Sequence, residues 1–256
     1  MSRIVKQLLY GLLHLGIFAA LLAIGYWLLL KPAPTCFDNV KNQGEEQIDC
    51  GGPCEACAIK KLKPLQALPL QLFDTGDGRT TVLIQIQNLN PDYGARSFSY
   101  TIRFADRDGA ELLASTQIAT IYAGELRGIV LPVLALDFQK ILRSSVVIAN
   151  IIWEPSATLV RPAVQTRELK TSVGAGDKFA SVEGRIQNNN PYALASVVVN
   201  AALLDREGLY MNASRTSIED VPAFNERAFK IAIPVTEQGK GVLDPERTRI
   251  FIDATR

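Results

Sequence analysis

Histidine is almost missing from this sequence of 256 residues. The one histidine, His14, lies within an apolar N-terminal run. The rest of the chain therefore has no imidazole that can act as a general base, a proton shuttle or a metal ligand. No Gly-x-Ser-x-Gly motif, phosphate-binding loop or spaced acidic pair takes its place. These absences predict that the protein is not an enzyme.

An excess of one charge is missing as well. The 27 lysines and arginines nearly balance the 26 aspartates and glutamates, which leaves a formal net charge of +1. Proteins that bind nucleic acid carry clustered basic side chains, so this composition predicts no DNA or RNA partner. The length of the chain accommodates about two domains of ordinary size.

Charged residues are absent from Leu8 to Leu30, where the sequence is almost continuously apolar. A helix of this length spans roughly 35 Å, which exceeds the ~30 Å hydrocarbon core of a bilayer. The run is longer than the apolar core of a cleaved signal peptide, and the Lys-Pro-Ala-Pro sequence that follows it does not resemble a cleavage site. We therefore predict that residues 1–31 form a cytoplasmic tail and a single-pass transmembrane anchor.

The same segment bears on partners and on orientation. Gly16 and Ala20 are spaced as a small-xxx-small pair, which makes a homodimer through the transmembrane helix one candidate assembly. Arg3, Lys6 and the amino terminus precede the apolar run, and Lys31 and Lys41 follow it. By the positive-inside rule this distribution slightly favours a cytoplasmic N-terminus.

Cysteine occurs in one short stretch, at Cys36, Cys50, Cys54 and Cys57. An even number of cysteines in so short a segment is typical of a disulfide-stapled module, because the segment cannot bury a sufficient core. We predict a cysteine-rich module over residues 32–58, with the pairing left open. A four-cysteine zinc site and a redox-active Cys-x-x-Cys are the alternatives. Disulfides require an oxidising compartment, so they predict that the bulk of the chain is extracytoplasmic.

Oxygen-bearing side chains crowd the loop between the first two cysteines, at Asp38, Asn42, Glu45 and Asp49. They form a candidate calcium site, because Ca²⁺ prefers about six to eight oxygen ligands. A well-solvated acidic loop is the simpler interpretation. We therefore expect no cofactor, with calcium in the cysteine module as the one exception to test.

The segment from Asp49 to Cys54, Asp-Cys-Gly-Gly-Pro-Cys, resembles a short motif of bacterial surface and secreted proteins. In those proteins the motif recurs beside adhesive or β-sandwich domains. The resemblance covers only the cysteine module, and it implies a location at the cell surface more than an activity.

The rest of the chain repeats itself at an offset close to one hundred residues. The sequence IQNLNP at residues 86–91 recurs as IQNNNP at residues 186–191. SFSYTIRFADRDG at residues 97–109 recurs as SVVVNAALLDREG at residues 196–208. The repeat predicts two copies of one domain.

Apolar and polar residues alternate within each copy, as they do from Phe98 to Phe104. A period of two is typical of a strand with one buried face. Short strands separated by turn residues predict an all-β fold, in which two tandem immunoglobulin-like β-sandwiches occupy residues 59–158 and 159–256. A helical turn is expected near Leu136 to Leu142.

A second resemblance rests on a strand that ends in Asn-x-Asn-Pro, an aromatic strand that closes on Asp-x-x-Gly, and a Gly-Glu turn. These features resemble the late-embryogenesis-abundant type 2 and FxLYD β-sandwich domains. In the first copy they are Phe98, Tyr100, Asp106, Gly109 and Gly124-Glu125. The second copy departs, because Val197 and Val199 replace the aromatic residues and Asn225-Glu226 replaces the turn, with Glu226 matched to Glu125. The resemblance implies a β-sandwich that is often tethered or exported and is in general not an enzyme.

Loops and edge strands of β-sandwiches commonly carry recognition. The candidate contact residues are Asn90, Pro91, Asn190 and Pro191, although an Asn-Pro pair also simply terminates strands. We therefore predict a structural or protein-interaction role in the cell envelope, with the membrane and other envelope proteins as partners. A metal-binding or redox role of the cysteine module is the alternative.

Overall fold

The computed structural model describes residues 3–27, 33–75, 78–174 and 178–256. The chain divides into two compact units, Met1–Leu62 and Lys63–Arg256. The first unit contains helix α1 (Arg3–Gly25), the cysteine module and a 3-10 turn, η2 (Ile59–Lys61). Every named strand among the described residues lies in the second unit.

Helix α1 is the one helix among the described residues that is long and apolar enough to cross a membrane. It begins at Arg3, earlier than the predicted Leu8, and residues 28–30 of the predicted span lie outside the described part. Gly16 and Ala20 are exposed on this helix. Dimerisation through them stays a prediction.

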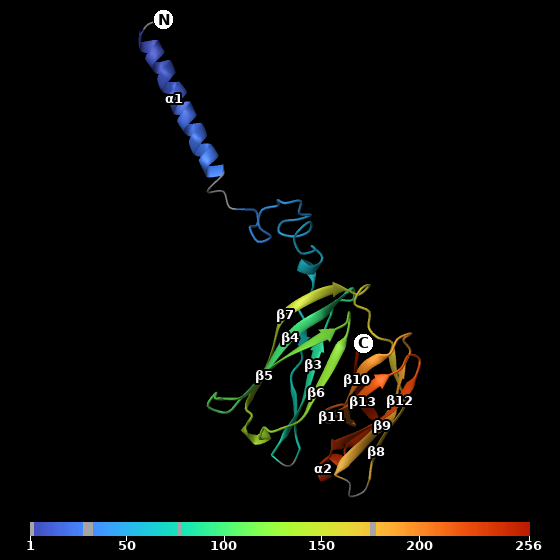
Figure 1. The fold of residues 1–256 in the computed structure, drawn as a ribbon. Helices are drawn as coiled ribbons and strands as arrows, with labels where there is room; N and C mark the ends of the chain where they lie inside the picture. The colour runs from blue at the N-terminus through green and yellow to red at the C-terminus, as the bar shows by residue number, and fades with distance from the viewer. Residues whose placement is uncertain (1–2, 28–32, 76–77, 175–177) are drawn as a thin grey trace. The chain divides into compact units, whose positions relative to one another are not determined.

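The second unit contains the strands of two sandwiches (Figure 1). The first sandwich consists of β1 (Gln66–Ala67), β2 (Gln71–Asp74), β3 (Thr80–Gln87), β4 (Tyr93–Ala105), β5 (Glu111–Ile121), β6 (Leu126–Leu134), η3 (Phe138–Lys140) and β7 (Arg143–Pro155). The second consists of β8 (Val164–Val173), β9 (Phe179–Asn188), β10 (Leu194–Asp205), β11 (Tyr210–Val221), β12 (Glu226–Pro234), α2 (Glu237–Lys240) and β13 (Leu243–Thr255).

Each sandwich pairs two antiparallel sheets. In the first sandwich β3 pairs with β1, β2 and β6, and the opposite sheet has the order β5-β4-β7. The second sandwich repeats this plan with the orders β12-β9-β8 and β11-β10-β13. The predicted all-β fold class is confirmed, and the turn expected near Leu136 to Leu142 is η3.

The alternating strand of the first copy is β4. Its residues Phe98, Ile102 and Phe104 are at most 1% exposed, and they pack with apolar residues of β3 in one core. In the second sandwich Val197 and Leu203 of β10 occupy the same register and are fully buried. The period of two therefore identified the buried face of both strands.

The two cores differ at several equivalent positions, of which one cross-strand pair shows a compensating change. Ile84 lies opposite Ile129 in the first sandwich, whereas Gly184 lies opposite Phe229 in the second. A Cβ atom on Gly184 would lie 2.9 Å from the Phe229 ring. One small and one large residue thus replace two of middle size, which keeps the core close-packed.

The turns that precede β6 and β12 show that the match of Glu226 to Glu125 is wrong. The backbone N–H of Asn88 donates to the carbonyl of Glu125, and that of Asn188 donates to the carbonyl of Asn225, both at 2.9 Å. Glu125 is therefore equivalent to Asn225 and not to Glu226. The shared glutamate was misleading, because the two copies repeat the backbone geometry of this turn and not its side chains.

A third apolar cluster joins the two sandwiches face to face. A Cβ atom on Gly128 of β6 would lie 2.4 Å from the ring of Phe251 in β13, so this position requires glycine. The strands β6 and β11 lie side by side here (Figure 1). The cluster consists of Phe73, Leu83 and Val130 from the first sandwich and Ala202, Ala213 and Phe251 from the second.

Two hydrogen bonds between side chains and their partners also cross this interface. The Gln85 side chain donates to the Tyr210 hydroxyl at 3.0 Å, and the backbone N–H of Val130 donates to the Asn200 side chain at 3.0 Å. Buried polar groups that keep their hydrogen bonds avoid the desolvation penalty of an unpaired group. The interface is therefore specified by hydrogen bonds as well as by shape.

The repeat explains why this face of the first sandwich docks and the equivalent face of the second does not. Leu83 lies opposite Val130 in the interface. At the equivalent positions Glu183 lies opposite Lys230, and their side chains form an exposed ion pair at 2.7 Å. A charged pair resists burial, so the face of the second sandwich stays in water.

The opposite half of the interface follows the same rule. Ala202 of β10 is fully buried against the first sandwich, whereas the equivalent Arg103 of β4 is exposed. The β3–β6 face of the first sandwich is thus complementary to the β10 face of the second, whereas the equivalent faces carry charged side chains.

We predict that the double variant Leu83→Glu with Val130→Lys, which copies the ion pair of the second sandwich, separates the two sandwiches. Each lost side chain contributes about 2 kcal/mol of burial to the interface. Calorimetry of the wild type should give one shared transition, and the variant should give two.

The matched control neutralises the exposed pair of the second sandwich by Glu183→Gln with Lys230→Gln, and it should keep one transition. A double variant that unfolds like the wild type would show that this face does not hold the sandwiches together.

Candidate functional site

The cysteine module contains two crossed disulfides. Cys36 pairs with Cys54 and Cys50 pairs with Cys57, with Cα atoms 5.6 Å and 4.9 Å apart. All four cysteines are bonded, so the predicted disulfides are confirmed. A zinc site needs thiolates, and a redox Cys-x-x-Cys needs Cys54 and Cys57 to pair with each other. Neither alternative fits this pairing.

Acidic side chains of the module bind its own backbone. An Asp49 oxygen accepts the N–H groups of Asp38 and Asn39 at 3.1 and 3.0 Å. An oxygen of the buried Glu45 accepts the N–H groups of Asn42 and Asp49 at 3.2 and 3.0 Å. These carboxylates replace the secondary structure that the segment lacks, since they satisfy loop amides that no strand or helix pairs.

Asp38 has a similar role at the start of the module. It accepts the N–H of Thr35 and the side-chain amide of Asn42 at 3.1 and 2.8 Å. These hydrogen bonds, that of Thr35 first, lower the pKa of Asp38. The predicted calcium ligands Asp38, Asn42, Glu45 and Asp49 are thus engaged with the loop itself, and calcium binding stays a prediction.

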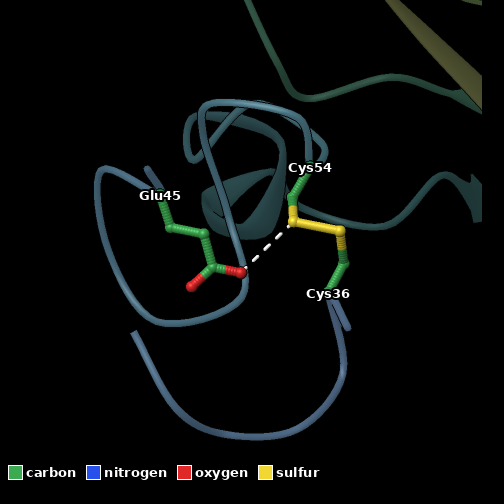
Figure 2. A group of neighbouring side chains, drawn as sticks. All are labelled: Cys36, Glu45 and Cys54. Atoms are coloured by element: carbon green, nitrogen blue, oxygen red, sulfur yellow. Dashed lines mark hydrogen bonds between the residues drawn. A yellow bond between two sulfur atoms is a disulfide. The ribbon is translucent and has the colours of Figure 1, made fainter. Parts of the chain in front are cut away.

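Figure 2 shows Glu45 beside the disulfide of Cys36 and Cys54. One Glu45 oxygen lies 3.2 Å from the Cys54 sulfur. A disulfide sulfur carries no hydrogen, so we treat this as a close contact and not as a hydrogen bond. The three side chains lie near enough to share an ion, but bonded sulfurs lack the negative charge that attracts one.

The Asn-x-Asn sequence forms the same structure in both copies. The Asn88 amide donates to the carbonyls of Tyr93 and Tyr122 at 2.7 and 2.9 Å, and its oxygen accepts the N–H of Asn90 at 3.0 Å. Asn188 and Asn190 repeat this arrangement. The first asparagine of each pair therefore ties the loop to the neighbouring turn.

The second asparagine holds the chain that enters its sandwich. The Asn90 side chain makes two hydrogen bonds to the backbone of Lys63, at 2.9 and 2.8 Å, and Asn190 makes two to Ala163, at 3.0 and 3.2 Å. Both asparagines are buried and are used within the fold. Pro91 and Pro191 remain exposed, so a contact role for these loops stays a prediction and falls on the prolines.

A cleft of about 600 Å³ lies between the sandwiches, beside the interface. Residues of β5, β13 and the connection from residue 158 to residue 162 form its walls. Its cationic side chains are Arg96, Arg127 and Arg256, and its acidic side chain is Asp253. Arg256 also lies over the ring of Tyr192, 4.4 Å from the ring centre, as a cation–π contact.

Buried charges lie where the cleft meets the interface. The Arg127 side chain is 9% exposed and pairs with Asp253 of the other sandwich. Glu125, whose side chain is 3% exposed, pairs with Arg161 of the connection at 3.3 Å. Burial raises the pKa of Glu125, against the opposing effects of the Tyr122 N–H and Arg161.

Arg127 is incompletely satisfied among the described residues. Its Nε and Nη1 atoms are buried and have no hydrogen-bond partner. An unpaired buried donor is costly unless water or a ligand reaches it. Sequence comparison missed this residue because Arg227 occupies the matching position of the second copy, where it is exposed. Only docking of the sandwiches makes Arg127 different.

No family model and no curated protein sequence matches the chain. Among solved structures, it is similar to red sea bream transglutaminase at 14% identity over 77% of this chain and 32% of that one, with a TM-score of 0.24. A β-glucuronidase of Ruminococcus gnavus is similar at 13% identity over 77% and 46%, with a TM-score of 0.20. This chain therefore spans less than half of either protein, and likenesses this weak carry no argument about function. The two family resemblances noted in the sequence stay predictions.

We predict that digestion without reductant yields peptides linking Cys36 to Cys54 and Cys50 to Cys57. Cys36→Ser with Cys54→Ser should cost the module about 3 kcal/mol, which limited proteolysis of residues 36–57 would detect. The unfolding transition of Lys63–Arg256 should not change, since that unit contains no cysteine. Mass spectra that link Cys54 to Cys57 would overturn the pairing.

We predict that Glu125 makes the free energy of unfolding depend on pH. Its raised pKa means that the folded state binds the proton more tightly, so its contribution is present at low pH and is lost as pH rises above the ordinary value of 4.5. Glu125→Gln removes this loss. The melting temperature of the variant relative to wild type should therefore rise between about pH 4 and pH 7.

The matched control is Glu226→Gln at the neighbouring sequence position of the other copy, where the carboxylate is more exposed. A melting difference for Glu125→Gln that stays constant with pH would show that this carboxyl titrates normally.

Proposed function

We propose that the chain is a non-catalytic, single-pass membrane protein with a structural or protein-interaction role in the cell envelope. Its N-terminus would be cytoplasmic, and the cysteine module with both sandwiches would face the extracytoplasmic side. The observation that carries this proposal is the pair of crossed disulfides in the segment that follows the apolar helix. Disulfides persist in oxidising compartments and are rare in the cytosol.

The packing of the two sandwiches supports the same role. Because they share an apolar cluster and ordered hydrogen bonds, they would present their loops and edges at a fixed spacing. A preorganised surface loses less entropy when a partner binds than two freely moving domains would. The same rigidity suits a spacer that holds another protein away from the membrane.

Orientation can be tested with a membrane-impermeant maleimide on right-side-out vesicles. Cysteine substituted for the exposed Arg107 of the β4–β5 turn should react, whereas cysteine substituted for Ser2 should react only after the membrane is permeabilised. The native cysteines are paired and do not compete. The opposite labelling pattern would contradict the proposed topology.

The interaction role can be tested by cross-linking in intact cells, purification through a C-terminal tag and mass spectrometry. A variant that keeps Met1–Leu62 but lacks Lys63–Arg256 is the matched control. An envelope protein recovered with the full chain and not with the control would support an interaction through the sandwiches. Self-links alone would favour the structural role, and recovery of cytoplasmic proteins alone would contradict both.

A further inference from the structure

We propose that the cleft between the sandwiches binds an extended acidic peptide segment of an envelope partner. In this arrangement a carboxylate of the segment pairs with the arginines of the cleft, and the peptide backbone lies along the free edge of β5. The inference rests on the protein-interaction role proposed above, because it names the chemistry of that partner.

The walls of the cleft are edges of sheets. Ile118, Ala119 and Thr120 of β5 all line it, although successive side chains of a strand point to opposite faces. A hollow that contacts three residues in a row must therefore run along the edge of the strand. β5 is the last strand of its sheet, so its outer N–H and C=O groups have no neighbouring strand. Added strands bind such edges through their main chain.

The second wall has the same character. Asp253, Ala254 and Thr255 of β13 also line the cleft in a row, and β13 is the last strand of its own sheet. An extended segment here would lie between two strand edges. Exposed apolar side chains, Ile118 at 76% and Val160 at 67%, offer contact area for alternate residues of that segment.

Charge selects an acidic segment. Three arginines and one aspartate line the cleft, which leaves an excess of positive side-chain charge. Arg96 is 65% exposed and is held only loosely by Glu154, at 3.7 Å. A carboxylate between these guanidinium groups would form charge-assisted hydrogen bonds, which are stronger than neutral ones.

Arg127 supplies the independent observation that points to a ligand. Its side chain is more than nine-tenths buried and lines the cleft, and two of its three guanidinium nitrogens have no hydrogen-bond partner among the residues that the structure describes. Asp253 uses only the third nitrogen. A carboxylate that enters the cleft would meet the donors that the fold itself leaves unpaired.

The test uses the full chain in detergent and fluorescence anisotropy of a labelled ten-residue peptide of alternating threonine and glutamate. We expect saturable binding, and binding about tenfold weaker when glutamine replaces glutamate, because each charge-assisted contact is lost. Arg127→Met and Arg96→Ala should each weaken binding about fivefold. Arg107→Ala, a matched loss of an exposed arginine outside the cleft, should leave it unchanged.

Several outcomes would overturn the proposal. No saturable binding up to about 1 mM, or equal binding of the glutamine peptide, would exclude an acidic segment. Equal displacement by free glutarate would assign the cleft to small acids and remove the role of the β5 edge. If Arg127→Met fails to fold, Arg96→Ala alone still tests whether the cleft binds the peptide. If an envelope partner is captured in cells but Arg96→Ala does not weaken that capture, the cleft is wrong while the proposed function stands.

Discussion

The contact between Phe251 and Gly128 is the constraint on which the rest of the structure depends. The ring occupies the space where any residue other than glycine at position 128 would place its side chain. With Leu83 and Val130 beside it, this contact turns two repeated domains into one compact unit. The same docking buries Arg127 against Asp253 and brings the edges of β5 and β13 to the two sides of one cleft. The candidate site therefore exists only because the sandwiches are packed together.

The two repeated domains share one strand plan, and a few differences in sequence make their faces complementary. The apolar pair Leu83 and Val130 corresponds to the ion pair of Glu183 and Lys230 in the other copy. Such differences make the docking face of the first sandwich apolar and the equivalent face of the second sandwich charged. Their placement also leaves the charged pair of the second sandwich exposed to the surroundings.

Local patterns were enough to predict a long apolar N-terminal helix, the disulfides and the β class. The alternation from Phe98 to Phe104 depends on neighbours along the chain, so it could be recognised in the sequence. The burial of Asn90 against Lys63 and the burial of Arg127 against Asp253 depend on residues far apart in the chain, so no local pattern encodes them. The cysteines are close in sequence, but their spacing alone does not select one pairing. One signal was available: Val82, Leu83 and Ile84 of β3 form a continuous apolar run, as expected of a strand that is buried on both faces.

The most direct test of this account is the distance between the two sandwiches in solution. Spin labels on cysteines substituted for the exposed Arg103 of β4 and Glu183 of β9 would report it by pulsed electron resonance, and the paired native cysteines would not take the label. The account predicts one narrow distance distribution, because the shared apolar cluster fixes the two domains. A broad distribution would contradict it, since it would mean that the sandwiches move independently and that the cleft has no fixed walls.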